Sequence, residues 1–307
     1  MPKSLHYWLL DSASLIKISY RVYVKYIFRF LFNWKTNHAW VSYLNSTPQM
    51  TRWKDDGYGI LHLKLQYSYL SVSFDYAERL LCLKQHYEWF FNQIDENYYL
   101  KEESIPLWQH VIDHEDSSEY LALYLQFRAE FKQEGEMALL LKLNGAIQYT
   151  LTFSYVLLNG QATFFIGGLQ GGRQHLTNPE SIKQLTKHLY GLRPKQLMLH
   201  ALSVLCDFYN VQRIVGVSNV NHASQGRRKN CKELVKTNMD EFWLEFGAQQ
   251  LSAQGDFLFK PLSCSIDLEQ VPSKKRNQYR KRQLILDGLF EQGKSQLSSL
   301  RQSFALE

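Results

Sequence analysis

The sequence is poor in the residues that hold small secreted or fibrous proteins together. Among 307 residues there are only 4 cysteines, 16 glycines and 7 prolines. The cysteines form no CxxC pair, which predicts reduced thiols in a cytoplasmic protein instead of a disulfide framework; they are Cys82, Cys206, Cys231 and Cys264. The scarcity of glycine and proline excludes collagen-like and linker-like chains.

Long hydrophobic runs are also missing. The longest stretch without a charged residue, 143–172, contains two Asn-Gly pairs and alternates polar with apolar side chains, so it predicts sheet and not a membrane span. The N-terminal residues show no clean apolar core with a cleavage site, so no signal peptide is predicted. What remains is a globular composition with 45% hydrophobic and 14% aromatic residues, which is enough to fill a sizeable core.

Residues 137–169 carry the clearest local signal. Asn144-Gly145 and Asn159-Gly160 each follow an apolar segment, and Asn-Gly supplies the positive φ that a two-residue type I′ turn requires. Between them, Ile147 to Tyr155 alternate apolar and polar side chains with period two. The segment predicts a three-stranded antiparallel meander.

Helix and strand signals continue beyond the meander. Helices are predicted over 178–190 and from Pro194 onward, followed by a strand at 213–219, a helix capped by Asn238 and a last strand at 257–262. The predicted class is α+β. The predicted domains are an N-terminal helical section (1–115), a core (116–270) and a basic C-terminal helical extension (271–307), with 98–118 interpreted as an irregular, acidic boundary.

The net charge is only +6, but the basic residues are clustered in two parts of the chain. Lys17, Arg21, Lys25 and Arg29 recur every four residues within an apolar segment. On a helix they form one stripe, so residues 1–35 are either a helix lying on a membrane surface or a core helix with one wet face. A second set is either a binding site for anionic lipid or a lipopolysaccharide precursor, or a solvated face; it comprises Arg227, Arg228, Lys274, Lys275, Arg276 and Arg280. Nucleic acid is a disfavoured partner because no recognised binding motif is present.

Several stretches together resemble the VirK/YbjX family of Gram-negative bacteria. They are IGGLQGGR (166–173), YGLRPKQLMLHAL (190–202), RIVGVSNVNHAS (213–224), EFWLEFGA (241–248) and VPSKKRNQYRKR (271–282). This family is a domain of unknown function. The resemblance implies a role in envelope homeostasis, virulence and resistance to antimicrobial peptides, and it supplies no catalytic residues.

The order of elements also resembles the GNAT superfamily of acyl-CoA-dependent N-acyltransferases. RIVGVSNVN is similar to its fifth strand and EFWLEFGA to its fourth helix. Gln170-Gly171-Gly172-Arg173 stands where that superfamily binds the pyrophosphate of CoA, with different glycine spacing. Phe242 and Trp243 lie on the helix that often carries a catalytic tyrosine there.

On this resemblance, acyl transfer needs an anion-binding loop, donors for an oxyanion and a base. Candidate cofactor-binding residues are Gln170, Gly171, Gly172 and Arg173, or Gly191 and Arg193 at the start of the next helix. His222 is the first candidate base and Asp240 the second, with Asn219 nearby. No metal site is predicted: His110 and His114 are spaced i, i+4 but lack the HExxH pattern.

Two functions therefore stay open. One is acyl-CoA-dependent acyl transfer to an envelope precursor or a protein, in the cytoplasm or at the inner membrane. The other is a non-enzymatic module that binds anionic lipid or an assembly partner. The oligomeric state is left open by the sequence.

Overall fold

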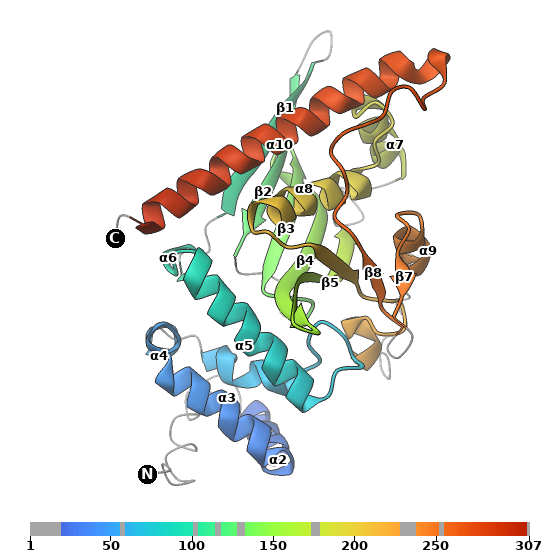
Figure 1. Cartoon of the computed structure of the whole chain (residues 1–307). Coiled ribbons are helices and arrows are strands. Elements are labelled where there is room, and N and C mark those ends of the chain that lie inside the picture. The colour runs from blue at the N-terminus through green and yellow to red at the C-terminus, as the bar shows by residue number, and fades with distance from the viewer. Residues whose placement is uncertain are drawn as a thin grey trace.

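A mixed sheet of eight strands forms the centre of the protein (Figure 1). The computed structural model describes residues 20–55, 59–100, 104–113, 118–127, 133–172, 179–227, 238–251 and 255–305. The strands follow the order β1-β2-β3-β4-β5-β6-β8-β7. The predicted α+β class is confirmed.

Five antiparallel strands make up the first part of the sheet: β1 (Ser104–Asp113), β2 (Ser118–Gln126), β3 (Met137–Leu143), β4 (Ala146–Leu158) and β5 (Gln161–Gly171). The φ angles are 48° and 82° at Asn144 and Gly145, and 52° and 74° at Asn159 and Gly160. Both Asn-Gly pairs thus have the positive φ predicted for type I′ turns, and the meander is confirmed.

The interpretation of 98–118 as irregular is wrong for most of its length. The segment contains the short helix α6 (Asn97–Leu100) and the whole of β1, which pairs with β2. A register shift between Pro106 and Trp108 puts Leu107 and Trp108 both in the core. This bulge breaks the period-two pattern by which a strand is found in a sequence. The domain boundary at 115 stays a prediction, although β1 and β2 on either side of it belong to one sheet.

The second part of the sheet is reached through two helices, α7 (Pro179–His188) and α8 (Pro194–Phe208). They lead to β6 (Arg213–Gly216), which pairs with β5 in parallel. The chain continues through η3 (Ala223–Arg227), α9 (Met239–Leu244), β7 (Gln249–Gln250) and β8 (Phe257–Phe259). As predicted, the Asn238 side chain caps α9 by accepting a hydrogen bond from the Glu241 amide at 3.3 Å. Asn178, the first residue of the helix predicted over 178–190, lies outside the described residues.

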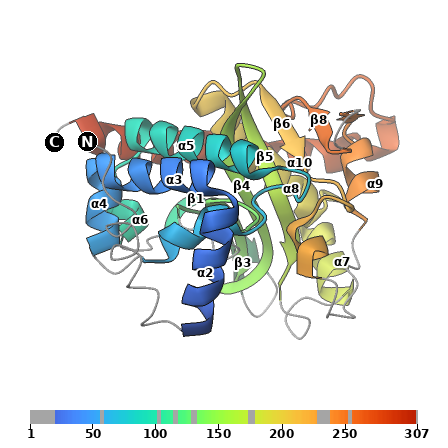
Figure 2. The ribbon, with the colours of Figure 1, turned by 90° about the horizontal axis from the view of Figure 1, so that it is seen from below.

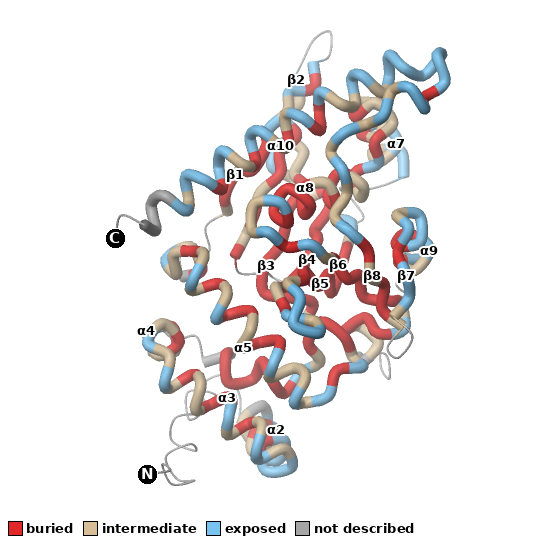
Figure 3. The backbone as a smooth tube through the Cα atoms, viewed as in Figure 1, coloured by how far each residue is buried: buried red, intermediate tan, exposed pale blue. Residues whose placement is uncertain are grey.

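Helices cover the sheet from two sides. The apolar helix α8 packs on β3 and β4, and the long helix α10 (Arg276–Ala305), preceded by η4 (Ser273–Lys275), crosses β1 and α8 (Figure 1). The helices before the sheet gather at the opposite end of the molecule (Figure 2); they are α2 (Tyr20–Phe32), α3 (Trp34–Ser46), α4 (Pro48–Asp55), η2 (Gly59–Gln66) and α5 (Tyr76–Gln93). Burial is concentrated in the sheet and α8, whereas the outer faces of α10 and α2 are exposed (Figure 3).

Helix α5 completes an edge of the sheet that β3 leaves open. Strand β3 pairs with β4 only as far as Phe153. Beyond that point the Tyr155 amide donates to Nδ1 of His86 at 3.2 Å, and the Leu157 amide donates to Oε1 of Gln85 at 2.9 Å. Two side chains of α5 therefore take the place of a neighbouring strand.

We expect this use of His86 to make stability depend on pH. Burial lowers the pKa of His86 from 6.5 to about 4. The unfolded chain therefore binds one more proton between these values, and the contribution of His86 is fully present above pH 6.5 and is lost as the pH falls toward 4. Between pH 7 and pH 5 this amounts to about 2 kcal/mol. In urea unfolding at both pH values, His86→Asn, which keeps an acceptor for Tyr155, should lose less stability than the wild type; equal losses would contradict the assignment.

Two predictions about the whole chain can be compared with the described residues. Within them, no helix is both long and apolar enough to cross a membrane. Cys82, Cys206 and Cys264 are free thiols. Cys231 lies outside the described residues.

Candidate functional site

The parallel strands β5 and β6 separate at a glycine-rich bulge. They pair only from Thr163 to Ile166 on β5, and the last contact is the Val217 amide donating to the Ile166 carbonyl at 2.9 Å. At this point the register between β4 and β5 skips Gly167. Beyond it β5 continues with β4, while the chain after β6 turns away into the loop 217–222. The edge of β5 that follows Ile166 therefore has no strand on this side within the described chain.

The carboxylate of Glu134 lies on this bulge. A Cβ atom built on Gly167 would fall 2.0 Å from the Glu134 carbonyl oxygen, and one built on Gly168 would fall 1.9 Å from Oε2 of the same residue. The clash at Gly167 is with backbone, so only glycine fits there, whereas at Gly168 a Cβ atom would displace the end of the Glu134 side chain. Nε2 of Gln170 donates to the two carboxylate oxygens at 2.6 and 2.7 Å. Glu134 is thus held at the point where the strands diverge.

His222, the first predicted base, reaches the same carboxylate from the loop after β6. Its Nε2 lies 3.5 Å from Oε1 of Glu134, and the two side chains are 6% and 9% exposed. The structure therefore brings together two predicted residues, His222 and Gln170, through a third that the sequence analysis missed. Glu134 precedes a strand in a polar segment, and nothing in its local sequence distinguishes it from a solvated loop residue.

The second nitrogen of His222 defines its tautomer. Nδ1 accepts the Ser224 amide at 3.2 Å and lies 2.8 Å from the Ser224 hydroxyl oxygen. Since Nδ1 is an acceptor, the proton of the neutral ring is on Nε2 and faces Glu134. Ser224 is only partly buried, whereas His222 is 4% exposed. Ser224 is therefore the least buried member of the row Ser224–His222–Glu134.

The other two predicted catalytic residues support the loop that carries His222. The Asn219 amide donates to Oδ1 of Asp240 at 2.7 Å, and Oδ1 of Asn219 accepts the Met239 amide at 3.1 Å. These contacts attach the N-terminus of α9 to the end of β6. Asn219 and Asp240 thus lie beside the site, and the contacts found for them are structural.

The buried carboxylate of Asp256 also holds the loop 217–222. Asp256, fully buried, accepts the Ser218 amide at 2.8 Å and the Asn221 side-chain amide at 3.1 Å. Burial raises the pKa of Asp256 above its usual value, while these hydrogen bonds act in the opposite direction. The carbonyl of Asn221 in turn accepts the Val72 amide at 2.8 Å. His222 follows a segment whose backbone is held from two directions.

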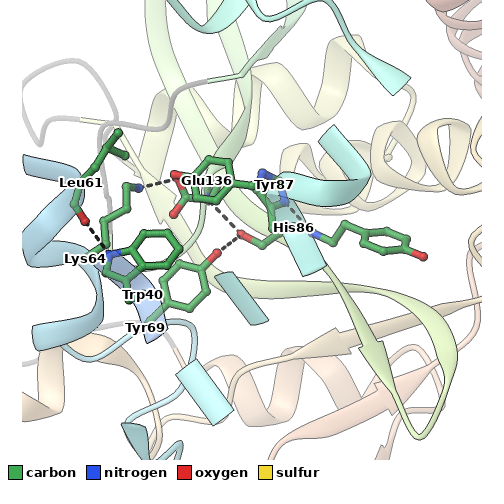
Figure 4. A network of polar contacts seen from close by, with 9 residues as sticks. Trp40, Leu61, Lys64, Tyr69, His86, Tyr87 and Glu136 are labelled. Carbon is green, nitrogen blue, oxygen red and sulfur yellow. Dashed lines mark hydrogen bonds and ion pairs between the residues drawn. The ribbon is translucent and has the colours of Figure 1, made fainter. Parts of the chain in front are cut away.

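Two residues beyond Glu134, Glu136 forms a buried ion pair with Lys64 (Figure 4). The Glu136 carboxylate binds Nζ of Lys64 and accepts the Tyr87 hydroxyl at 2.6 Å. Its amide donates to Oγ of Ser154 at 2.9 Å, and Ser154 also contacts the Tyr69 hydroxyl at 2.8 Å. The network joins η2, α5 and β4 to the start of β3, and so fixes the segment that carries Glu134 across the sheet.

The amides of the predicted anion-binding loops are engaged within the protein. Gly172 donates to the Gln148 carbonyl at 2.7 Å, Gly191 to the Thr186 carbonyl at 2.8 Å, and Arg193 to Oε1 of Gln196 at 3.2 Å. A phosphate at these positions would therefore be held by side chains. Gly171 ends β5 opposite Tyr149, and Arg173 lies outside the described residues.

The basic start of α10 packs beside Gly191, one of the predicted cofactor-binding residues. Gln278 and Arg282 at the start of α10 donate to the Tyr190 carbonyl at 3.1 and 3.0 Å and cover Gly191, which has a φ of 81°. Arg193 pairs with the Glu245 carboxylate, with Nη1 to Oε1 at 3.3 Å. The exposed residues Lys274, Lys275, Arg276 and Arg280 thus lie at the helix start that packs beside Gly191, whereas Arg227 ends η3. Arg228 lies outside the described residues.

The described residues also form two cavities away from the bulge. One of about 550 Å³ lies between the start of β6, β8 and the end of α9, and is lined by Arg213, Phe246 and Lys260 among others. The other, of about 430 Å³, lies between β1 and α10, beside Trp108 and Gln292.

The family described as "Protein of unknown function (DUF535)" matches residues 16–295. An uncharacterized protein of Escherichia coli (strain K12), YbjX, is 26% identical over 231 residues, which cover 75% of this chain and 69% of the relative. An uncharacterized protein of Haemophilus influenzae is 28% identical over 229 residues, covering 72% and 75% of the two chains. No solved structure matches the chain.

Proposed function

We propose that this chain, a member of the DUF535 family, transfers an acyl group from an acyl-CoA thioester to an amine. The family match and the similarity to YbjX confirm the resemblance to the VirK/YbjX family. The observation that carries the proposal is the divergence of β5 and β6 at Gly167 beside Ser224, His222 and Glu134. The order of elements from β3 to β8 is the one on which the resemblance to the GNAT superfamily rests. In that comparison β5 takes the place of strand four, β6 that of strand five and α9 that of helix four.

The divergence suits a thioester for a physical reason. An edge strand presents amide donors at regular spacing, and an extended acyl-pantetheine chain can lie along it as a peptide does. In this proposal the thioester carbonyl, where negative charge develops as the amine attacks, accepts from β5 amides beyond Ile166. The diphosphate would contact side-chain cations, of which Arg193 is a predicted candidate.

The proton has a defined route out of the acceptor. As the C–N bond forms and the C–S bond breaks, the amine proton passes to the Ser224 oxygen while the serine proton moves to Nδ1 of His222. The imidazolium that forms is stabilised by the Glu134 carboxylate at Nε2. CoA leaves as the thiolate, which then takes up the proton held by His222, so that the neutral imidazole is restored. This relay makes use of the tautomer that the Ser224 amide imposes on His222.

The first experiment is calorimetric binding of acetyl-CoA and palmitoyl-CoA to the purified full chain. We expect micromolar binding of one thioester and weaker binding by Arg193→Ala. Arg52→Ala, which removes an exposed arginine that pairs with Glu96 as Arg193 pairs with Glu245, is the matched control and should bind as the wild type does. Absence of binding by both thioesters would refute the acyl-CoA proposal and favour the second candidate, a non-enzymatic module on the same fold.

The biological setting stays a proposal as well. The resemblance implies envelope homeostasis, virulence and resistance to antimicrobial peptides. On that basis the acceptor amine would belong to an envelope precursor or a protein, and the site would act in the cytoplasm or at the inner membrane. Comparing such acceptors in the same transfer assay tests this part separately from thioester binding.

A further inference from the structure

Helix α2 exposes apolar side chains on the face that points away from the protein. Tyr26 and Phe30 are buried against the helices behind it, with exposed fractions of 2% and 5%. On the outer face, Phe28 is 62% exposed, Leu31 54% and Phe32 85%. Leu31 and Phe32 follow Phe28 by three and four residues, so all three side chains lie next to one another on the helix surface. A contiguous apolar patch of this kind on a protein surface marks a contact with another phase or molecule.

Cations border the patch, and acids are missing from it. Arg21 and Lys25 are exposed on the same side of α2, one turn apart. The segments of α2 and α3 contain four basic residues, the other two being Arg29 and Lys35, and no Asp or Glu. Such a surface is complementary in charge to an anionic partner and apolar at its centre.

We propose that this α2 surface (Tyr20, Arg21, Lys25, Phe28, Leu31 and Phe32) docks on an anionic phospholipid bilayer. A bilayer accepts both features at once, because its headgroups carry the negative charge and its acyl boundary accommodates aromatic and aliphatic side chains. Tyr20 and Trp34 flank the patch and are 72% and 40% exposed. Tyrosine and tryptophan side chains are enriched at the level of the lipid headgroups. The helix lies in the plane of the interface and does not span it.

The α2 surface is distinct from the other basic region of the chain. Lys274 and Lys275 in η4, with Arg276 and Arg280 at the start of α10, lie at the opposite end of the molecule (Figures 1 and 2). That region has one large exposed apolar side chain nearby, Leu284 at 71%. It offers charge without an apolar patch, and therefore provides a matched control.

The test is flotation of the full chain with vesicles of phosphatidylcholine, with and without phosphatidylglycerol. We expect binding only when phosphatidylglycerol is present, and weakening by added salt. Phe28→Ser/Phe32→Ser should weaken binding at least tenfold, and Arg21→Gln/Lys25→Gln should weaken it about fivefold per cation. Lys274→Gln/Lys275→Gln and Leu284→Ser should bind as the wild type does.

Three results would overturn the proposal. The first is equal binding to both kinds of vesicle, or binding to neither. The second is loss of binding in the α10 variants instead of the α2 variants. The third is an α2 variant that changes the oligomeric state of the protein in solution without changing vesicle binding. The last result would assign the surface to a second copy of the chain. Melting temperatures close to that of the wild type establish that the exposed substitutions leave the fold intact. Because the readout is vesicle binding, it does not depend on acyl transfer.

Discussion

Replacement of His222 by glutamine is expected to reduce acyl transfer roughly 10²- to 10⁴-fold, the range that a positioned acid or base contributes. His222 is the group that connects the Ser224 hydroxyl to the buried Glu134 carboxylate. Without it the amine proton has no acceptor in the relay. The rate is measured as thiol released from acetyl-CoA or palmitoyl-CoA in the presence of a lysine-containing peptide or ethanolamine.

Glu134→Gln and Ser224→Ala separate the parts of this relay. The first keeps the shape of the side chain but removes the charge that stabilises the imidazolium. The neutral base then persists to lower pH, so the pH at which the rate reaches half its maximum should move downward, with little change in thioester binding. The second removes the hydroxyl and should lower the rate while leaving binding unchanged. His110→Gln, on the distant edge strand β1, is the matched control. An unchanged rate in His222→Gln would refute the assigned role.

Breaking the buried pair of Lys64 and Glu136 should cause the largest loss of stability in the chain. Their side chains are 6% and 1% exposed. Glu136→Leu leaves a buried ammonium group without its carboxylate and leaves the Tyr87 hydroxyl without its acceptor, and it should lower the free energy of unfolding by about 3–5 kcal/mol. Urea unfolding monitored by circular dichroism measures this loss.

The double variant Lys64→Met/Glu136→Leu tests whether the cost comes from the unpaired charge. A well-packed apolar pair often replaces a buried ion pair with little loss, so the double variant should recover most of the stability that the single variant loses. Lys294→Gln is the control, because it breaks an ion pair with Asp207 in which the two side chains are 39% and 50% exposed. It should lower the free energy of unfolding by under about 1 kcal/mol. A double variant as unstable as the single one would show that the loss arises from packing and from the unpaired Tyr87 hydroxyl, and not from the unpaired charge.

Local signals in the sequence were sufficient for the elements that depend on neighbouring residues. The two Asn-Gly turns and the capped helix α9 each follow from side chains within a few positions of one another. The same kind of signal failed at β1, because its bulge beside Pro106 interrupts the alternation and its strand character comes from pairing with β2. Turn and cap chemistry is encoded locally, whereas a bulged edge strand is defined by its partner.

The sequence by itself therefore determined the α+β class, the meander, the family and His222 as a candidate base. The tertiary structure alone decided what His222 faces, since Glu134 is brought to it by the register of β3 to β5 and by the bulge at Gly167. It also decided that Lys64 is a buried partner of Glu136, 72 residues away, and that the apolar face of α2 carrying Phe28 and Phe32 points outward. Periodicity shows that a face is apolar, but only packing determines whether that face meets the core or the solvent, and only strand register determines which distant charges meet.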